Sequence, residues 1–96
     1  MRAERMRPAA GIAATPAVPF APPSLRTTRD IRLVRATADL WRVVDLSGRV
    51  IGHLQLIAHP LGLRCRARRY HPPTARFRDI GDFWSPDDAV AALRAG

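Results

Sequence analysis

Arginines at alternating positions are the residues of this chain most clearly arranged for chemistry. Residues 63–78 contain six arginines and no acid, whereas residues 79–88 contain four aspartates and no basic residue. Alternate side chains of a β-strand point to the same face of a sheet. We therefore expect one sheet face rich in guanidinium groups, which bind phosphates through paired hydrogen bonds. The alternating arginines are Arg64, Arg66, Arg68, Arg76 and Arg78.

Further side chains are expected to lie on the same face. Tyr70 could stack on a base or contact a phosphate, and His53 and Gln55 belong to the polar side of the preceding strand. A two- or three-stranded ribbon has the width of the DNA major groove, where arginine reads guanine edges. The alternative is an ordinary solvated sheet face in an arginine-biased proteome. The predicted nucleic-acid-binding residues are Arg42, Arg49, Arg64, Arg66, Arg68, Tyr70, Arg76 and Arg78.

The overall composition supports this expectation only in part. The net charge of +8 favours polyanionic partners. All 16 basic residues are arginine, asparagine is absent and alanine also numbers 16. A GC-rich genome would impose the same bias, so the position of the charge is more informative than its amount.

No arrangement typical of catalysis or metal binding is present. The chain has no glycine-rich phosphate loop and no Gly-x-Ser-x-Gly motif. Its potential metal ligands are widely spaced, and Cys65 is expected to point inward between Leu63 and Ala67 as a small apolar residue. The four aspartates that follow the basic stretch are expected to cap the helix, order the corner and pair with nearby arginines. We therefore predict no enzymatic activity, no metal site and no cofactor.

The elements that would position these side chains form a small α+β domain. We expect a three- to four-stranded antiparallel sheet packed by one C-terminal helix. Ser47-Gly48 predicts a two-residue turn, and residues 31–34 are either a short strand or a packed lead-in. Ile80, out of phase with Phe77 on the inward side, indicates a bulge or a strand end. The clear strands are expected over residues 41–46, 49–57, 63–70 and 76–80.

The C-terminal helix has the most specific local pattern. Ser85 is a favoured N-cap, Pro86 suits the first helical position, and Asp87 and Asp88 lie near the positive end of the helix dipole. Its apolar stripe is expected to cover the apolar face of the sheet. Trp41 and Phe83 are predicted to join that core, with Trp84 as a further candidate.

The chain divides into a disordered Ala/Pro/Arg-rich tail over residues 1–28 and the folded domain over residues 29–96. Five prolines between positions 8 and 23 oppose helix formation in the tail. A single cysteine excludes an intramolecular disulfide. No apolar run approaches the ~20 residues that cross a bilayer, so we expect a cytoplasmic protein without a membrane partner.

Residues 41–95 resemble the sheet-plus-helix DNA-binding domains of plant ethylene-response factors and the arm-type domains of tyrosine integrases. The resemblance lies in Tyr70, the Ile80-Gly81-Asp82-Phe83 corner and the Asp88-Ala89-Val90-Ala91-Ala92 helix. It implies that the sheet face opposite the helix enters the major groove. The groove-facing roles would then fall on Arg64, Arg66, Arg68, Arg76 and Arg78, although those families carry an apolar residue where this chain has Arg78.

The chain also resembles small uncharacterised sheet-plus-helix proteins of high-GC actinobacteria. This resemblance lies in Trp41, Val43, Gly48, Gly52 and the Phe83-Trp84-Ser85-Pro86-Asp87-Asp88-Ala89-Val90 segment. It implies a domain but no biochemical activity.

Two functional hypotheses follow from the sequence. The first is a small basic module that binds nucleic acid, DNA rather than RNA, through its arginine face. The second is a protein-interaction or accessory module that docks an acidic partner or forms a homodimer through a sheet edge.

Overall fold

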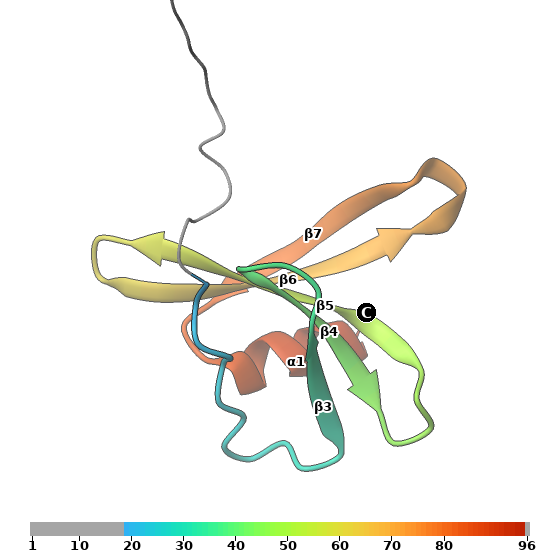
Figure 1. The fold of residues 1–96 in the computed structure, drawn as a ribbon, viewed down its shortest axis with the longest axis horizontal. Helices are drawn as coiled ribbons and strands as arrows, with labels where there is room; N and C mark the ends of the chain where they lie inside the picture. The colour runs from blue at the N-terminus through green and yellow to red at the C-terminus, as the bar shows by residue number, and fades with distance from the viewer. Residues whose placement is uncertain (1–18, 96) are drawn as a thin grey trace, which may run out of the picture.

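The computed structural model describes residues 19–95, which form one antiparallel sheet and one α-helix (Figure 1). The order of the strands in the sheet is their order in the chain. The predicted α+β class with a C-terminal helix is confirmed, but the predicted three to four strands are wrong because the sheet has five. The elements are β3 (Ile31–Arg35), β4 (Leu40–Asp45), β5 (Val50–His59), β6 (Gly62–His71), the short 3-10 helix η2 (Pro72–Thr74), β7 (Arg76–Phe83) and α1 (Pro86–Ala95).

The additional strand is β3, at one edge of the sheet. It pairs with β4 along its whole length, from Ile31 opposite Asp45 to Arg35 opposite Trp41. The guanidinium of Arg35 lies 4.7 Å from the centre of the Trp41 ring. The strand has three half-buried residues, two exposed ones and none that is fully buried, so the sequence alone does not distinguish it from a packed lead-in.

The turn between β4 and β5 is longer than predicted. Four residues, 46–49, separate the two strands, and Gly48 has a φ of 86°, which glycine adopts without steric cost. The Asp45 carboxylate accepts hydrogen bonds from the Ser47 hydroxyl (2.6 Å) and from the backbone N–H of Ser47 and Arg49 (2.9 and 3.0 Å). These bonds lower the pKa of Asp45 and favour the longer turn.

Strand β7 continues past the predicted end through a bulge. Phe83 lies opposite Cys65 and Gly81 opposite Ala67, but the next pair joins Asp79 to Arg68. Ile80 is therefore an extra residue on β7, which confirms the bulge among the two predicted alternatives.

Helix α1 covers the face of the sheet formed by β5, β6 and β7. It begins at Pro86 as predicted, and the Ser85 hydroxyl accepts the Asp88 N–H at 3.4 Å. The helix lies so close to β5 that a Cβ on Gly52 would be only 2.6 Å from a Leu93 methyl group.

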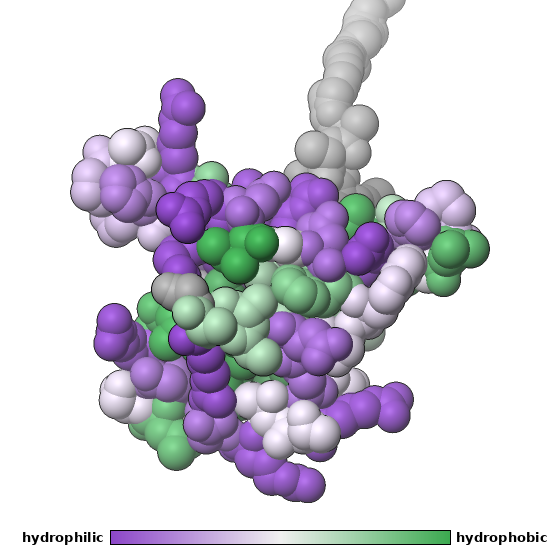
Figure 2. Space-filling view, turned by 180° about the vertical axis from the view of Figure 1, so that it is seen from behind, coloured by the Kyte–Doolittle hydropathy of each residue, from purple (hydrophilic) through white to green (hydrophobic). Residues whose placement is uncertain are grey.

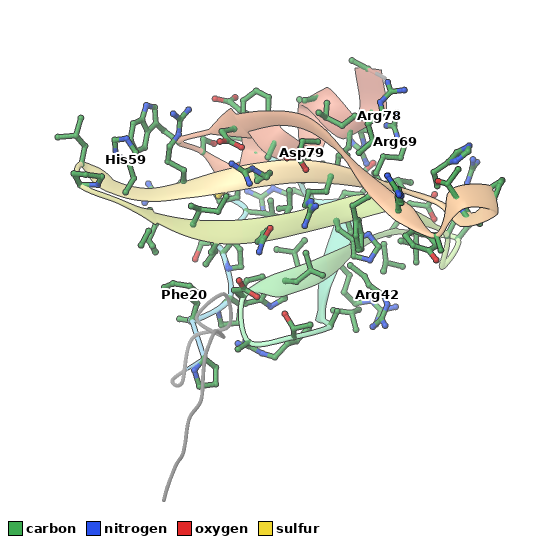
Figure 3. The ribbon with its side chains drawn as sticks, turned by 90° about the horizontal axis from the view of Figure 1, so that it is seen from above. Phe20, Arg42, His59, Arg69, Arg78 and Asp79 are labelled. Atoms are coloured by element: carbon green, nitrogen blue, oxygen red, sulfur yellow. The ribbon has the colours of Figure 1, made fainter. Side chains whose placement is uncertain are left out.

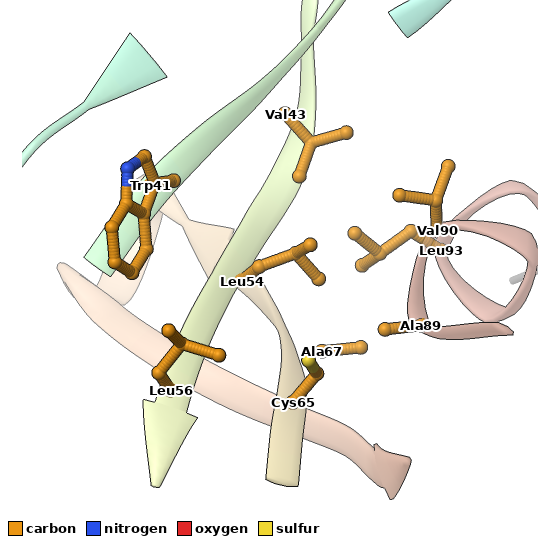
Figure 4. Close-up of a cluster of buried hydrophobic side chains, with 9 residues drawn as sticks. All are labelled: Trp41, Val43, Leu54, Leu56, Cys65, Ala67, Ala89, Val90 and Leu93. Carbon is orange, nitrogen blue, oxygen red and sulfur yellow. The ribbon is translucent and has the colours of Figure 1, made fainter. Parts of the chain in front are cut away.

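The core is a single cluster between the helix and the sheet (Figure 4). Phe83 packs against this cluster as predicted, whereas Trp84 is 52% exposed and is not part of it. Cys65 points inward as predicted, and burial raises the pKa of its thiol. The buried members are Trp41, Val43, Leu54, Leu56, Cys65, Ala67, Ala89, Val90 and Leu93.

The segment before β3 contacts the domain from Phe20 onward. Phe20 and Leu25 pack against the core. The Asp87 carboxylate accepts three backbone N–H groups, from Arg26 (2.9 Å), Thr27 (3.1 Å) and Thr28 (2.8 Å). Residues 1–18 of the predicted tail lie outside the described residues, but residues 20–28 pack on the domain rather than extending from it.

Hydrophilic and hydrophobic side chains are interspersed on the surface seen in Figure 2, from behind the view of Figure 1. Within residues 19–95, no helix has the length and apolar character needed to cross a membrane.

Candidate functional site

The sheet face opposite the helix contains the arginines of β6. This strand alternates regularly, so Cys65 and Ala67 are buried on the helix side. Arg64, Arg66 and Arg68 therefore share the other face, which we call the open face. The predicted placement of these three arginines on one face is confirmed.

Two of these arginines are paired with aspartates of β7. Arg66 donates two hydrogen bonds to the Asp82 carboxylate, at 2.8 and 3.0 Å, and lies 3.7 Å from Asp79. Arg68 donates to Asp79 at 2.8 Å. The paired Arg66 lowers the pKa of Asp82, and Asp82 in turn raises the pKa of Arg66. The predicted pairing of Asp79 and Asp82 with nearby arginines is confirmed, and it neutralises the middle of the open face.

The pairing extends across the sheet as a hydrogen-bonded row. Arg68 also donates to the Gln55 side-chain oxygen at 3.2 Å, and Gln55 donates to Asp39 at 3.0 Å. Asp39 is 9% exposed and accepts a further bond from the Thr37 hydroxyl. A buried carboxylate with two side-chain donors stabilises this arrangement, because removing either donor would leave it under-satisfied.

Arg64 has a different environment at the other end of β6. Its guanidinium donates to the Asp82 carbonyl at 2.9 Å and lies 4.4 Å from the centre of the exposed Trp84 ring. Within residues 19–95 Arg64 pairs with no carboxylate, but its hydrogen bond and its aromatic contact are both within the domain.

Arg76 and Arg78 of β7 lie on the opposite side from Arg64, Arg66 and Arg68, which corrects the sequence-based prediction. Beyond the Ile80 bulge, Arg78 lies directly opposite Arg69, and Phe77 opposite Tyr70. Residues directly opposite each other in an antiparallel pair point to the same side. Phe77 is thus on the open face instead of inward, while Arg78 points to the helix side of the sheet beside Arg69 (Figure 3). The reason is the extra residue, because a one-residue shift exchanges the two faces of a strand.

Residues 69–78 form the far part of the β6–β7 hairpin, which extends beyond helix α1 (Figure 1). We call this segment the distal ribbon. It contains Arg69, Arg76 and Arg78 and no acid. Arg69 donates to the Leu93 carbonyl near the end of the helix. Arg76 and Arg78 are exposed, and no carboxylate within residues 19–95 pairs with either.

The side of the distal ribbon that continues the open face is aromatic. The Tyr70 and Phe77 rings are 5.3 Å apart, and the His53 ring meets Phe77 edge-on at 5.0 Å. The Arg68 guanidinium lies 4.7 Å from the centre of the Phe77 ring. Phe77 is therefore held on two sides, while Tyr70 remains 43% exposed.

The remaining predicted residues approach the ribbon from the other strands. Arg42 is exposed and lies directly opposite His53. Burial lowers the pKa of His53, and Arg42 and Arg68 lower it further. A groove of about 810 Å³ is lined by Arg49, His53, Arg69 and Tyr70, so Arg49 is brought to the same end of the molecule.

The structure adds Arg69 to the predicted set. The same alternation that places Arg68 on the open face places Arg69 on the helix side. Nothing in the sequence pattern indicated a binding residue on that side. Only the register with β7 shows that Arg69 has an arginine neighbour.

Comparison with known protein families, curated proteins and solved structures gives no match for this chain. The likeness to the ethylene-response-factor, integrase and actinobacterial domains therefore stays a resemblance of sequence pattern.

Proposed function

We propose that this chain is a nucleic-acid-binding module whose phosphate contacts come from the distal ribbon rather than from the middle of the open face. The observation that carries the proposal is the contrast in pairing. Arg66 and Arg68 are bound to carboxylates, while Arg76 and Arg78 are exposed without one in the described chain. Unpaired guanidinium groups do not have to exchange a carboxylate for a phosphate.

The position of these arginines also opposes a purely compositional origin. Arg69 and Arg78 lie directly opposite each other, and like charges in that position destabilise a sheet. A polyanion bound along the ribbon would relieve that repulsion. Arg49 lines the same groove as Arg69, so the positive surface extends from the ribbon toward β5.

The test uses two double variants with the same change in net charge. Arg76→Gln/Arg78→Gln removes two cations from the ribbon, and Arg29→Gln/Arg32→Gln removes two exposed cations near β3. Fluorescence polarisation is measured with a labelled 20-mer duplex, single-stranded DNA and single-stranded RNA at several salt concentrations.

The ribbon variant should bind more weakly than the parent chain. On duplex DNA its slope of log K against log salt should be less steep by about 1.8, since each phosphate contact contributes about 0.9 to the steepness. The β3 variant should bind like the parent chain. Equal weakening of both variants would show that binding depends on total charge alone, and would refute the proposal.

A protein-interaction module is the second candidate, and one observation favours it. The turn between β5 and β6 and the end of β7 expose Leu61 (81%), Leu63 (47%) and Trp84 (52%). Exposed apolar residues grouped at one end of a small domain are typical of protein contacts. Light scattering tests the homodimer form of this candidate. A parent chain that is a dimer, and that Leu61→Ser/Leu63→Ser converts to a monomer, would support it. A monomeric parent chain would exclude the homodimer and leave a different protein as the only partner of this surface.

A further inference from the structure

A hollow of about 310 Å³ lies at the tip of the distal ribbon. Tyr70 and Phe77, which lie on the open face, line it together with Arg76 and Arg78, which project from the other side of β7 at the edge of the sheet. Small-ligand sites have this order of size, and they combine apolar walls with a few polar groups. The hollow is therefore large enough for one nucleobase and has cations at its border.

The tip that forms the hollow is held in one shape by local bonds. Pro72 begins η2, and the Pro72 carbonyl accepts the Ala75 N–H at 3.1 Å. The Thr74 hydroxyl lies 3.0 Å from the His71 ring nitrogen and donates to the His71 carbonyl at 3.3 Å. A ligand that enters a preformed site incurs little ordering cost.

Tyr70 is the more exposed of the two rings. Phe77 is contacted by the Arg68 guanidinium and by the edge of the His53 ring, which fix its position. Tyr70 contacts the Phe77 ring and is 43% exposed. The Tyr70 hydroxyl makes no hydrogen bond within residues 19–95, so the ring does not depend on that group for its position.

We propose that the hollow receives an unpaired base of single-stranded nucleic acid, stacked on Tyr70, while Arg76 and Arg78 hold the adjoining phosphates. This inference rests on the proposed function and names the class of ligand. A base within a duplex presents only its edges, because both of its faces are covered by neighbouring base pairs. A ring that stacks on a base face therefore selects unpaired nucleotides, and the arginines beside it supply the phosphate contacts common to all nucleic acids.

The test separates stacking from charge. Binding of a 12-nucleotide thymidine strand, the matching uridine strand and a 12-base-pair duplex is compared for the parent chain, Tyr70→Ala and Tyr70→Phe. Tyr70→Ala should weaken binding of the single strands about 5- to 150-fold, the range for removal of one stacking ring. It should leave the duplex affinity and the salt slope unchanged, because no charge is removed. Tyr70→Phe should bind single strands like the parent chain.

A second measurement does not depend on a variant. A single strand with one 2-aminopurine should show a change in fluorescence when the parent chain binds, because stacking alters the emission of that base. Tyr70→Ala should abolish the change while Arg76→Gln/Arg78→Gln should keep it at saturating protein.

The outcomes distinguish this inference from the proposed function. Binding that depends on Arg76 and Arg78 but is equal for duplex and single strands, with no effect of Tyr70→Ala, would overturn the stacking site and leave the phosphate-binding ribbon intact. Absence of binding to all three nucleic acids would overturn both.

Discussion

The half of the β6–β7 hairpin beneath helix α1 and the half beyond it contain the same residue type in opposite surroundings. Beneath the helix, Arg66 is bound to Asp82 through two hydrogen bonds and Arg68 to Asp79 through one. Beyond it, Arg76 and Arg78 are exposed and face no carboxylate in the described chain. The difference shows that a run of arginines is not by itself a binding surface, because some of its members stabilise the sheet on which the others are carried.

The bulge at Ile80 marks the border between the two halves. On its helix-backed side, Asp82 lies opposite Arg66, and on its far side Arg78 lies opposite Arg69. One inserted residue thus separates a stretch with oppositely charged neighbours from a stretch with like-charged neighbours. The paired half gains stability from its charges, and the charges of the unpaired half are the ones to which we assign the proposed phosphate contacts.

The largest expected effect tests whether stability resides in the helix-backed half. Leu54→Ala removes a side chain that is 0% exposed and lies opposite both Ala67 and Trp41. It should lower the free energy of unfolding by about 2–5 kcal/mol. Tyr70→Ala in the distal ribbon removes a larger side chain but should cost only about 1 kcal/mol, the value of one aromatic contact. Urea denaturation of both variants measures the difference, and equal losses would contradict the division into two halves.

The next effect concerns Asp87, whose carboxylate binds backbone N–H groups instead of an arginine side chain. Its three backbone donors hold the pKa of Asp87 well below its usual value. Asp87→Asn replaces one acceptor oxygen with a donor that must face either the Arg26 N–H or those of Thr27 and Thr28. The variant should be less stable at pH 7 by about 1 kcal/mol, a value typical of a lost capping group in a largely solvated position.

The difference in unfolding free energy between the parent chain and Asp87→Asn should depend on pH, because folding lowers the pKa of Asp87. An unfolded aspartate titrates near about 3.9, and the folded one titrates lower. The folded chain therefore binds fewer protons in this range, so the contribution is present above about pH 4 and is lost as the pH falls toward the folded pKa. Unfolding measured at pH 7 and in steps below pH 4 should show the parent and the variant converging, and a constant difference would exclude the carboxylate as its cause.

A smaller effect distinguishes an arginine paired with a carboxylate from an unpaired one. Replacing the first should lower the free energy of unfolding, and replacing the second should raise it. Arg66→Met keeps the apolar stem but leaves Asp82 without its paired donors, and it should destabilise the fold by about 1 kcal/mol for a pair that is one-third exposed. Arg78→Met removes a charge opposite Arg69 and should stabilise the fold by about 0.2–0.5 kcal/mol. Both differences should shrink in high salt. Two changes of the same sign would show that the halves do not differ electrostatically.

These contrasts show which features the sequence could predict. Regular alternation along residues 63–70 correctly placed Arg64, Arg66 and Arg68 on one face, because β6 has no irregularity there. The reversal of Arg76 and Arg78 could not be predicted, since alternation within a strand carries no information about its register with a neighbour across a bulge. The same limit applies to the Gln55–Asp39 contact, which joins residues 16 positions apart through a sheet register that no local pattern encodes.

The smallest effect tests how far the positive charge of the open face extends toward the ribbon. Burial lowers the pKa of His53 first, followed by the nearby Arg42 and Arg68. An unfolded histidine titrates near about 6.5, so the folded chain binds fewer protons just below that value. The stability that this histidine contributes is present above about pH 6.5 and decreases as the pH falls toward the folded pKa. His53→Gln should therefore show a flatter dependence of the unfolding free energy between pH 7 and pH 5 than the parent chain.

Arg42→Gln should move the NMR titration of the His53 ring to higher pH by removing a facing cation. An unchanged titration in that variant would show that burial alone sets the pKa and that the field of the arginines does not reach across the sheet.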